Sequence, residues 1–146
     1  MRRGVTLLEL VLVLAIIGVL AGVVVPGAAY FADRVAVEHQ ATRILSAYRS
    51  AWLTARTQQR LTLLRITADT LAIRTVLSAG AVDTTLVWMS TGPAEAGVAL
   101  TSPAHTTVFA PDGVAMGLSN TSHRLQKGGA RRQVVVSRLG RVRISP

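Results

Sequence analysis

The chain has no cysteine and few acidic residues: its 146 residues include seven Asp and Glu against sixteen Lys and Arg. Without thiols it forms no disulfide bond, offers no thiolate to a zinc ion and has no cysteine nucleophile. A domain exported to an oxidising compartment is often held by disulfides, so such a domain must here be stabilised by core packing alone. The three histidines are far apart in the sequence and lack metal-ligand spacing.

Sequence signatures of catalysis are also missing. The chain contains no Gly-x-Ser-x-Gly elbow and no phosphate-binding loop, and no two acidic residues form a close pair. We therefore expect a protein that is not an enzyme, with no catalytic residue, no metal site and no cofactor.

Acidic residues are absent from the C-terminal part, since none follows Asp112. The same part carries seven basic residues, namely Arg124, Lys127, Arg131, Arg132, Arg138, Arg141 and Arg143. Such a block suits a polyanion, which is a nucleic acid, a membrane surface or an acidic protein. A structural interpretation competes with it, because positive charge also protects an edge strand against sheet-to-sheet aggregation.

What the chain does have is an apolar run over residues 4–25. A helix across such a run is roughly 30 Å long, which matches the hydrocarbon core of a bilayer. Arg2 and Arg3 precede the run, so the positive-inside rule predicts a single span with a cytoplasmic N-terminus. Glu9 is the one carboxylate in the run, and an ionisable group in lipid requires a partner. Glu9 is therefore the first candidate functional residue.

Ordinary explanations of this run remain open. A secretory signal has a basic start and a small-residue cleavage site, here near Gly27, but its apolar stretch is only about 7–15 residues long. An uncleaved membrane anchor explains the length of the run but not Glu9. A carboxylate at a helix N-terminus also gains about 0.3–1 kcal/mol from the helix dipole, which would give Glu9 a purely local role.

A resemblance to a known family offers another explanation of the apolar run and of Glu9. The segment Gly4-Val5-Thr6-Leu7-Leu8-Glu9 resembles the processing site of type IV prepilins and type II secretion pseudopilins. The resemblance implies a leader of residues 1–4, which a prepilin peptidase removes by cutting between Gly4 and Val5, and methylation of the new N-terminus. Glu9 would then be the fifth residue of the mature protein.

The chemistry of Glu9 agrees with that resemblance. Cleavage places a charged amine on Val5, about one helical turn from Glu9. In a helical assembly, Glu9 of one subunit can neutralise that amine on the next subunit inside the apolar bundle. Losing one partner of a buried ion pair leaves an uncompensated charge that costs about 3–5 kcal/mol. We therefore expect Glu9 to set the register of assembly.

The helix is expected to continue beyond the membrane to about Gln59. Pro26-Gly27 should bend or weaken it, because proline removes one backbone hydrogen bond. Further on, spacings of four and three residues predict an amphipathic face made of Ala41, Leu45, Tyr48, Trp52 and Ala55. We expect residues 5–26 to form the transmembrane and assembly helix and residues 27–59 its periplasmic half. Tyr48 and Trp52 are predicted to be core anchors.

From Leu61 onward the pattern changes to short β-prone runs. Pro111-Asp112-Gly113 is predicted to be a turn and Lys127-Gly128-Gly129-Ala130 a loop. The fold class is therefore α+β, with a long N-terminal helix packed on a mainly antiparallel β-sheet domain at residues 60–146. The predicted strands are residues 61–66, 71–76, 85–89, 98–100, 106–110, 114–118, 133–137 and 141–144.

Two C-terminal segments, Val108–Gly113 and Leu139–Arg143, resemble the domain shared by H-type pseudopilins and T-type minor pilins. Side chains alternate along a strand, so Arg141 and Arg143 are predicted to share one face, about 7 Å apart, where they suit phosphate oxygens. By resemblance to the T-type pilins these two arginines are the candidate DNA-binding or polyanion-binding residues. The expected supporting loop consists of Lys127, Arg131 and Arg132.

Together these features predict a minor pseudopilin, a structural subunit of a type II secretion pseudopilus that serves protein export across the outer membrane. The alternative is a type IV minor pilin that binds DNA non-specifically during uptake. The expected location is the bacterial inner membrane, with a single span, a cytoplasmic N-terminus and a periplasmic C-terminal domain. The expected partners are prepilin peptidase, other pseudopilins or pilins, the inner-membrane assembly platform and membrane lipid, with DNA added under the alternative.

Overall fold

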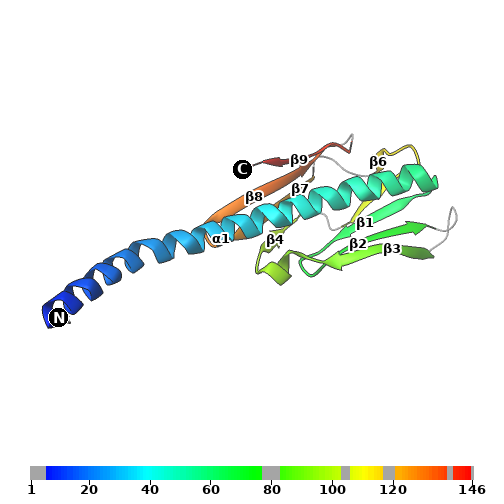
Figure 1. Cartoon of the computed structure of the whole chain (residues 1–146). Helices are drawn as coiled ribbons and strands as arrows, with labels where there is room; N and C mark the ends of the chain where they lie inside the picture. Colours follow the sequence, from blue (N-terminus) through cyan, green and yellow to red (C-terminus); the bar gives the residue numbers. More distant parts are fainter. Residues whose placement is uncertain (1–5, 77–82, 103–105, 117–120, 138–139, 146) are drawn as a thin grey trace.

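The computed structural model describes residues 6–76, 83–102, 106–116, 121–137 and 140–145, without the side chains of residues 23–26. Within these ranges the fold consists of one long helix, α1 (Leu7–Gln58), followed by nine strands and a short 3₁₀ helix. All strand pairs are antiparallel. The predicted α+β fold, with a long N-terminal helix on an antiparallel β-sheet domain, is confirmed (Figure 1).

Helix α1 is 52 residues long and unbroken at Pro26. It begins after Thr6, which caps its N-terminus, and it ends at Gln59, which has a left-handed backbone conformation (φ 52°). Figure 1 shows that the helix curves gently along its first half as it leaves the β-sheet domain. The expected bend at Pro26-Gly27 is thus a smooth curve within one continuous helix, because tertiary contacts further along the chain fix only its second half.

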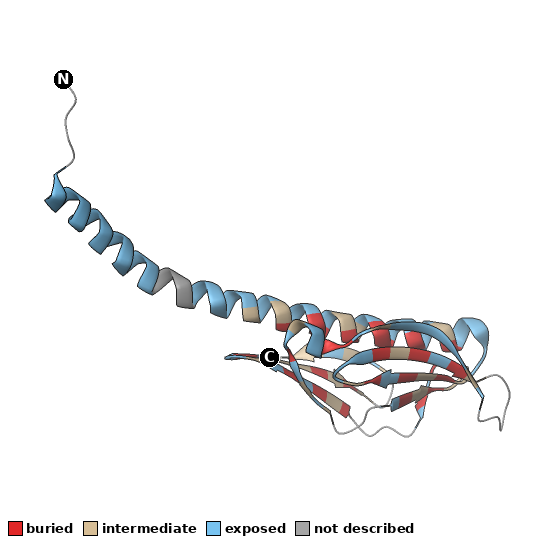
Figure 2. Ribbon diagram, turned by 90° about the horizontal axis from the view of Figure 1, so that it is seen from below, coloured by how far each residue is buried: buried red, intermediate tan, exposed pale blue. Residues whose placement is uncertain are grey.

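The second half of α1 packs on the sheets through a stripe of mostly small side chains (Figure 2). The predicted face is partly wrong, because Leu45 is half-buried and Trp52 is 36% exposed. Alanines dominate the true stripe and let the helix approach the strands closely, whereas the larger Leu45 and Trp52 lie at its margin. The buried residues of the stripe are Val37, Gln40, Ala41, Ile44, Ala47, Tyr48, Ala51 and Ala55.

The strands form two sheets. The first has the order β3-β2-β1-β5-β6, and the second has the order β4-β7-β8-β9. The first sheet comprises β1 (Thr62–Ile66), β2 (Thr70–Val76), β3 (Thr84–Thr91), β5 (Thr106–Phe109) and β6 (Ala115–Met116). The second comprises β4 (Ala99–Thr101), β7 (Thr121–Lys127), β8 (Ala130–Val136) and β9 (Val142–Ser145). The 3₁₀ helix η1 (Pro93–Ala96) connects β3 to β4.

Most predicted strands are present, but β7 was missed and β8 begins three residues earlier than expected. The expected loop at 127–130 is a tight turn that joins β7 to β8. The strand predicted at 114–118 is only β6 among the described residues, since 117–120 lie outside them. Strand β7 was not predicted because two of its inward side chains, Thr121 and His123, are polar. The alternation of apolar and polar residues that indicates a half-buried strand is therefore not visible in its sequence.

The predicted turn at Pro111-Asp112-Gly113 is confirmed. The backbone N–H of Gly113 donates to the carbonyl of Ala110 (2.8 Å), and the Asp112 carboxylate accepts from the N–H of Val114 (2.9 Å). Gly113 has φ 87°, a conformation that L side chains rarely adopt, so glycine is required at this position.

Tyr48 is confirmed as a core anchor and is 1% exposed. Its hydroxyl bonds His123 Nε2 (2.7 Å) and Thr107 Oγ1 (3.1 Å), which belong to different sheets, and its ring meets Phe109 edge-on at 6.3 Å. His123 Nδ1 also bonds Ser102 Oγ (2.7 Å). Tyr48 therefore ties both sheets to α1 through a buried polar network.

Because the Tyr48 hydroxyl is buried in this network, the stability of the domain should fall as the pH becomes alkaline. Burial raises the pKa of Tyr48 to about 12, although the hydrogen bond from Thr107 opposes this rise, whereas an unfolded phenol titrates at about 10. In that window the unfolded state has lost a proton that the folded state keeps. The free energy of unfolding should therefore fall by roughly 2–3 kcal/mol between about pH 10 and 12.

Urea unfolding of the full chain in detergent, measured between pH 9 and pH 11.5, tests this prediction. The matched control is Tyr48→Phe, which keeps the ring but removes the titrating hydroxyl. The variant should start less stable and lose less stability as the pH rises. Equal pH slopes for the two proteins would contradict the prediction.

Candidate assembly segment and basic groove

Gly4 and Val5, the predicted processing site, lie outside the described residues. The structure begins at Thr6, whose side-chain oxygen accepts a hydrogen bond from the backbone N–H of Glu9 (3.2 Å). Glu9 is exposed in the first turn of α1. Thr6 and Glu9 thus have the Thr-x-x-Glu spacing of a helix capping box. This local signal was readable in the sequence, and the structure confirms Thr6 as the N-cap of α1.

The first half of α1 projects from the domain, and none of its side chains that the structure describes is buried (Figure 2). An 18-residue window of this helix has a mean hydropathy of 2.9, and none of it is buried. Within the described residues, α1 is the one helix long and apolar enough to cross a membrane. Large side chains such as Leu7 (82% exposed) and Val19 (70%) are bare. A surface of this kind requires lipid or other apolar helices around it.

Two of the five predicted polyanion-binding residues are engaged with α1. The Lys127 ammonium lies 3.6 Å from a carboxylate oxygen of Asp33, and it donates to the carbonyl of Ala96 (3.0 Å). Arg132 Nε lies 2.6 Å from the Glu38 carboxylate. Both pairs are partly exposed, so each contributes at most about 1 kcal/mol. Their effect is to fasten the β7–β8 turn to the helix where the helix leaves the domain.

The remaining predicted residues, Arg131, Arg141 and Arg143, are exposed. Arg131 is the second residue of β8, whereas Arg143 pairs with Val135 near the other end of that strand. A seven-residue strand spans roughly 20 Å. The five residues therefore do not form one cluster: three lie around the β7–β8 turn, and two lie near the β8–β9 connection.

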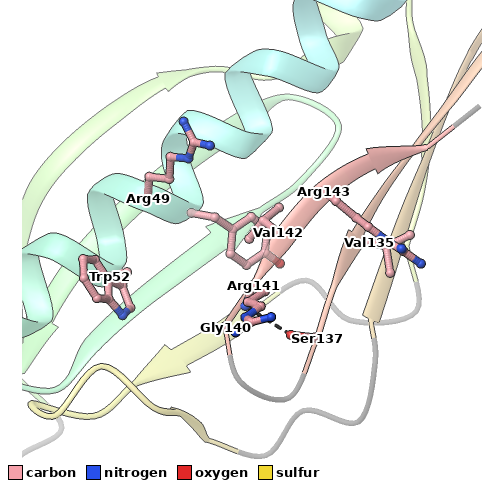
Figure 3. A pocket seen from close by; sticks show the side chains of 9 residues that line it. Arg49, Trp52, Val135, Ser137, Gly140, Arg141, Val142 and Arg143 are labelled. Carbon is pink, nitrogen blue, oxygen red and sulfur yellow. Dashed lines mark hydrogen bonds between the residues drawn. The ribbon is translucent and has the colours of Figure 1, made fainter.

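Arg141 and Arg143 line a groove of about 810 Å³ between α1 and the edge strand β9. Figure 3 shows Arg49 and Trp52 on α1, across from β9; Val142 points toward the helix, and Arg143 points away from it. The groove is lined by Tyr48, Arg49, Trp52, Val135, Ser137, Gly140, Arg141, Val142 and Arg143. Three of these residues are arginines and none is acidic, so the groove favours an anionic ligand.

Trp52 is held at the margin of this groove rather than in the core. The Arg56 guanidinium carbon lies 5.0 Å from the centre of its ring, a cation–π contact. A Cβ on Gly113 would come within 2.6 Å of Trp52 Nε1, so the β5–β6 turn packs directly on the indole. The prediction of Trp52 as a core anchor is therefore wrong, and its ring faces the groove.

The observed fold is that of the type IV pilins. Two crystal forms of the type IV minor pilin FimU from Pseudomonas aeruginosa are similar in structure to this chain. The first has a TM-score of 0.65 at 17% identity, with 80% of this chain and 92% of FimU covered. The second has a TM-score of 0.60 at 16% identity, with coverage of 75% and 92%. None of the curated proteins compared with this chain matches it in sequence.

Residues 1–25 match the model of the prokaryotic N-terminal methylation motif. The chain combines this motif with the pilin fold, the two features expected of the type IV pilin and pseudopilin superfamily. The chain therefore joins an N-terminal methylation motif to the pilin fold, and its apolar N-terminal helix is long enough to cross a membrane.

Proposed function

We propose that this protein is a minor, non-enzymatic subunit of a type IV pilin-like filament. The supporting observation is that the bare first half of α1 continues without interruption into the helix that anchors the domain. A subunit built in this way can exchange a lipid environment for a bundle of identical or related helices while its domain stays folded. The proposed location is the bacterial inner membrane, with the N-terminus cytoplasmic and the domain periplasmic.

The proposed division of the chain follows from that role. Residues 1–4 form the leader, 5–26 the transmembrane and assembly helix, 27–59 its periplasmic half, and 60–146 the globular domain. Glu9 pairs with the amine of a neighbouring subunit in the filament. The proposed partners are prepilin peptidase, other pilins or pseudopilins, and the inner-membrane assembly platform.

Within this class, we propose a role in a type II secretion pseudopilus. The position of the basic residues favours this role over DNA uptake, because Lys127 and Arg132 form ion pairs with α1 and do not join Arg141 and Arg143. Of the five predicted residues, the alternative DNA-binding minor pilin is left with one exposed pair, Arg141 and Arg143, because the exposed Arg131 lies toward the other end of β8. Non-specific DNA binding generally needs more phosphate contacts than two side chains supply.

Gly4→Ala is expected to block removal of the leader. Co-expression of the full chain with a prepilin peptidase should shorten the wild-type protein by the four residues Met1–Gly4, because the peptidase cuts after the glycine. The uncut variant should keep the leader and fail to enter filaments. Intact-mass spectrometry of the membrane fraction measures the difference.

Val5→Phe is the matched control, because it changes the other side of the same bond to a residue common in prepilins. It should be cleaved like the wild type. An unchanged mass for the wild-type protein, or normal cleavage of Gly4→Ala, would refute the prepilin assignment.

A further inference from the structure

We infer that the open edge of β9 is a docking site for an extended segment of a partner protein, one that carries acidic side chains at alternate positions. The segment would add to the second sheet as a further strand and fill the groove between β9 and α1. The groove is derived from this chain alone. Identifying the partner as another subunit of the filament rests on the function proposed above.

Strand β9 has backbone N–H and C=O groups that do not pair with β8. The N–H of Ser137 donates to the carbonyl of Arg141 (2.9 Å), so these two residues form a hydrogen-bonded pair. Such pairs alternate along an antiparallel ladder, which makes Arg143 and Val135 the next hydrogen-bonded pair. The N–H and C=O groups of Val142 and Ile144 therefore point away from β8.

Among the strands that the structure describes, none other than β8 pairs with β9, so these groups are not covered by a second strand. Strand β9 is the last strand of its sheet and pairs only with β8. In the described part of the chain, no backbone hydrogen bond outside the sheet ladders involves Val142 or Ile144. An edge of this kind accepts an extended peptide by strand addition, with main-chain bonds supplying affinity and alternate side chains supplying specificity.

An added strand would meet charged side chains on one of its faces and apolar side chains on the other. Arg143 points away from α1 (Figure 3), and both Arg143 and Arg141, two positions before it, are exposed and would lie beside every second residue of the incoming segment. On the helix side lie the indole of Trp52 and the side chain of Val142 (Figure 3). An incoming strand with carboxylates on one face and apolar side chains on the other matches both surfaces.

The segment that fits this edge comes from a protein other than this chain. This chain has only seven acidic residues, and no two of them are two positions apart, so a second copy of it lacks a matching strand. A DNA duplex matches the arginines but makes no ladder bonds to Val142 and Ile144 and has no extended backbone to fill the groove. The observations therefore favour a different protein with an alternating acidic strand.

A synthetic peptide of about ten residues that alternates Glu and Val is the probe. It should bind the full chain in detergent micelles and slow hydrogen exchange at the amides of Val142 and Ile144 at least tenfold. The double variant Arg141→Gln/Arg143→Gln should weaken binding about tenfold, as expected for two exposed charge pairs. Arg124→Gln is the matched control, since Arg124 is also exposed on the second sheet but lies outside the groove, and it should bind within twofold of wild type.

A second peptide with N-methylated backbone amides separates strand addition from simple charge attraction. It should fail to bind. No binding by the first peptide, or equal binding by both, would overturn the inference, as would binding that leaves the Val142 and Ile144 amides exchanging freely. Arginine-dependent binding of a DNA duplex without binding of the peptide would overturn it in favour of nucleic acid.

The peptide experiment does not depend on filament assembly. If the peptide fails to bind while Gly4-dependent processing and filament entry hold, only the docking inference is wrong. If the peptide binds but the leader is never removed, the filament role is wrong and the groove stands.

Discussion

Glu9→Leu is expected to abolish incorporation into filaments while leaving membrane insertion intact. Leucine makes the apolar run of α1 more favourable in lipid, so the amount of protein in the membrane should not fall. The new N-terminal amine would enter the filament without a counter-charge, at a cost of about 3–5 kcal/mol. That cost lowers the equilibrium for incorporation by roughly two to four orders of magnitude. Quantitative immunoblotting of sheared filaments and membranes measures both quantities.

The control must separate the charge of Glu9 from its position three residues after the N-cap Thr6, where a Glu or Gln side chain can help to cap the helix. Glu9→Gln serves this purpose, because Gln suits the same capping position but carries no charge. If charge pairing is the role, Gln should fail as Leu does. Normal incorporation of Glu9→Gln would reduce Glu9 to a local helix cap, and normal incorporation of Glu9→Leu would refute both roles.

The sequence predicted those elements whose signals are local. The apolar run and the helical spacing beyond it gave one helix from about Val5 to about Gln59, against an observed Leu7–Gln58. The β-prone runs at 61–66 and 71–76 predicted strands β1 and β2, which are confirmed and pair with each other as a hairpin. Proline and glycine placed the turn at 111–113, because few other residues adopt its backbone geometry.

What the sequence did not predict depends on partners that are distant in the chain. Strand β7 has a buried histidine, His123, whose ring nitrogens bond Tyr48, 75 positions away, and Ser102, 21 positions away. Arg132 belongs to a block of positive charge in the sequence, but its partner Glu38 lies 94 positions away on α1. Charge runs therefore overstate the polyanion site, since a one-dimensional pattern shows no ion pairs.

The candidate groove is also formed by residues that are distant in the chain. Arg141 and Arg143 were identifiable from their spacing, but Arg49 and Trp52 join them only because α1 crosses the second sheet at this point. Trp52 was expected in the core because of its helical spacing from Leu45, Tyr48 and Ala55. The turn at Gly113 packs against the Nε1 side of the indole, and Trp52 stays 36% exposed at the margin of the groove. The site is thus a product of packing rather than of a motif.

Gly92→Ala is expected to destabilise the domain by about 3 kcal/mol. Gly92 is buried against the β1–β2 turn, where its N–H donates to the carbonyl of Asp69 (2.7 Å). A Cβ at this position would come within 2.3 Å of the Ala68 carbonyl oxygen, which is a backbone atom and cannot rotate away. The turn and η1 would have to separate, and the bond from the N–H of Ala94 to the Ala68 carbonyl (2.9 Å) would weaken with them. Urea unfolding followed by tryptophan fluorescence measures the loss.

Gly97→Ala is the matched control for that substitution, because it adds the same methyl group five positions away at the other end of η1. Its Cβ would meet only the flexible Lys127 side chain, at 3.6 Å, so no backbone has to move. Gly97 has φ 66°, and the strain of alanine in that left-handed conformation costs about 1–2 kcal/mol. Gly92→Ala should therefore be clearly the more damaging of the two. If both variants lose the same stability, the close approach of Gly92 to the Ala68 carbonyl does not limit the size of the residue at this position, and the prediction is wrong.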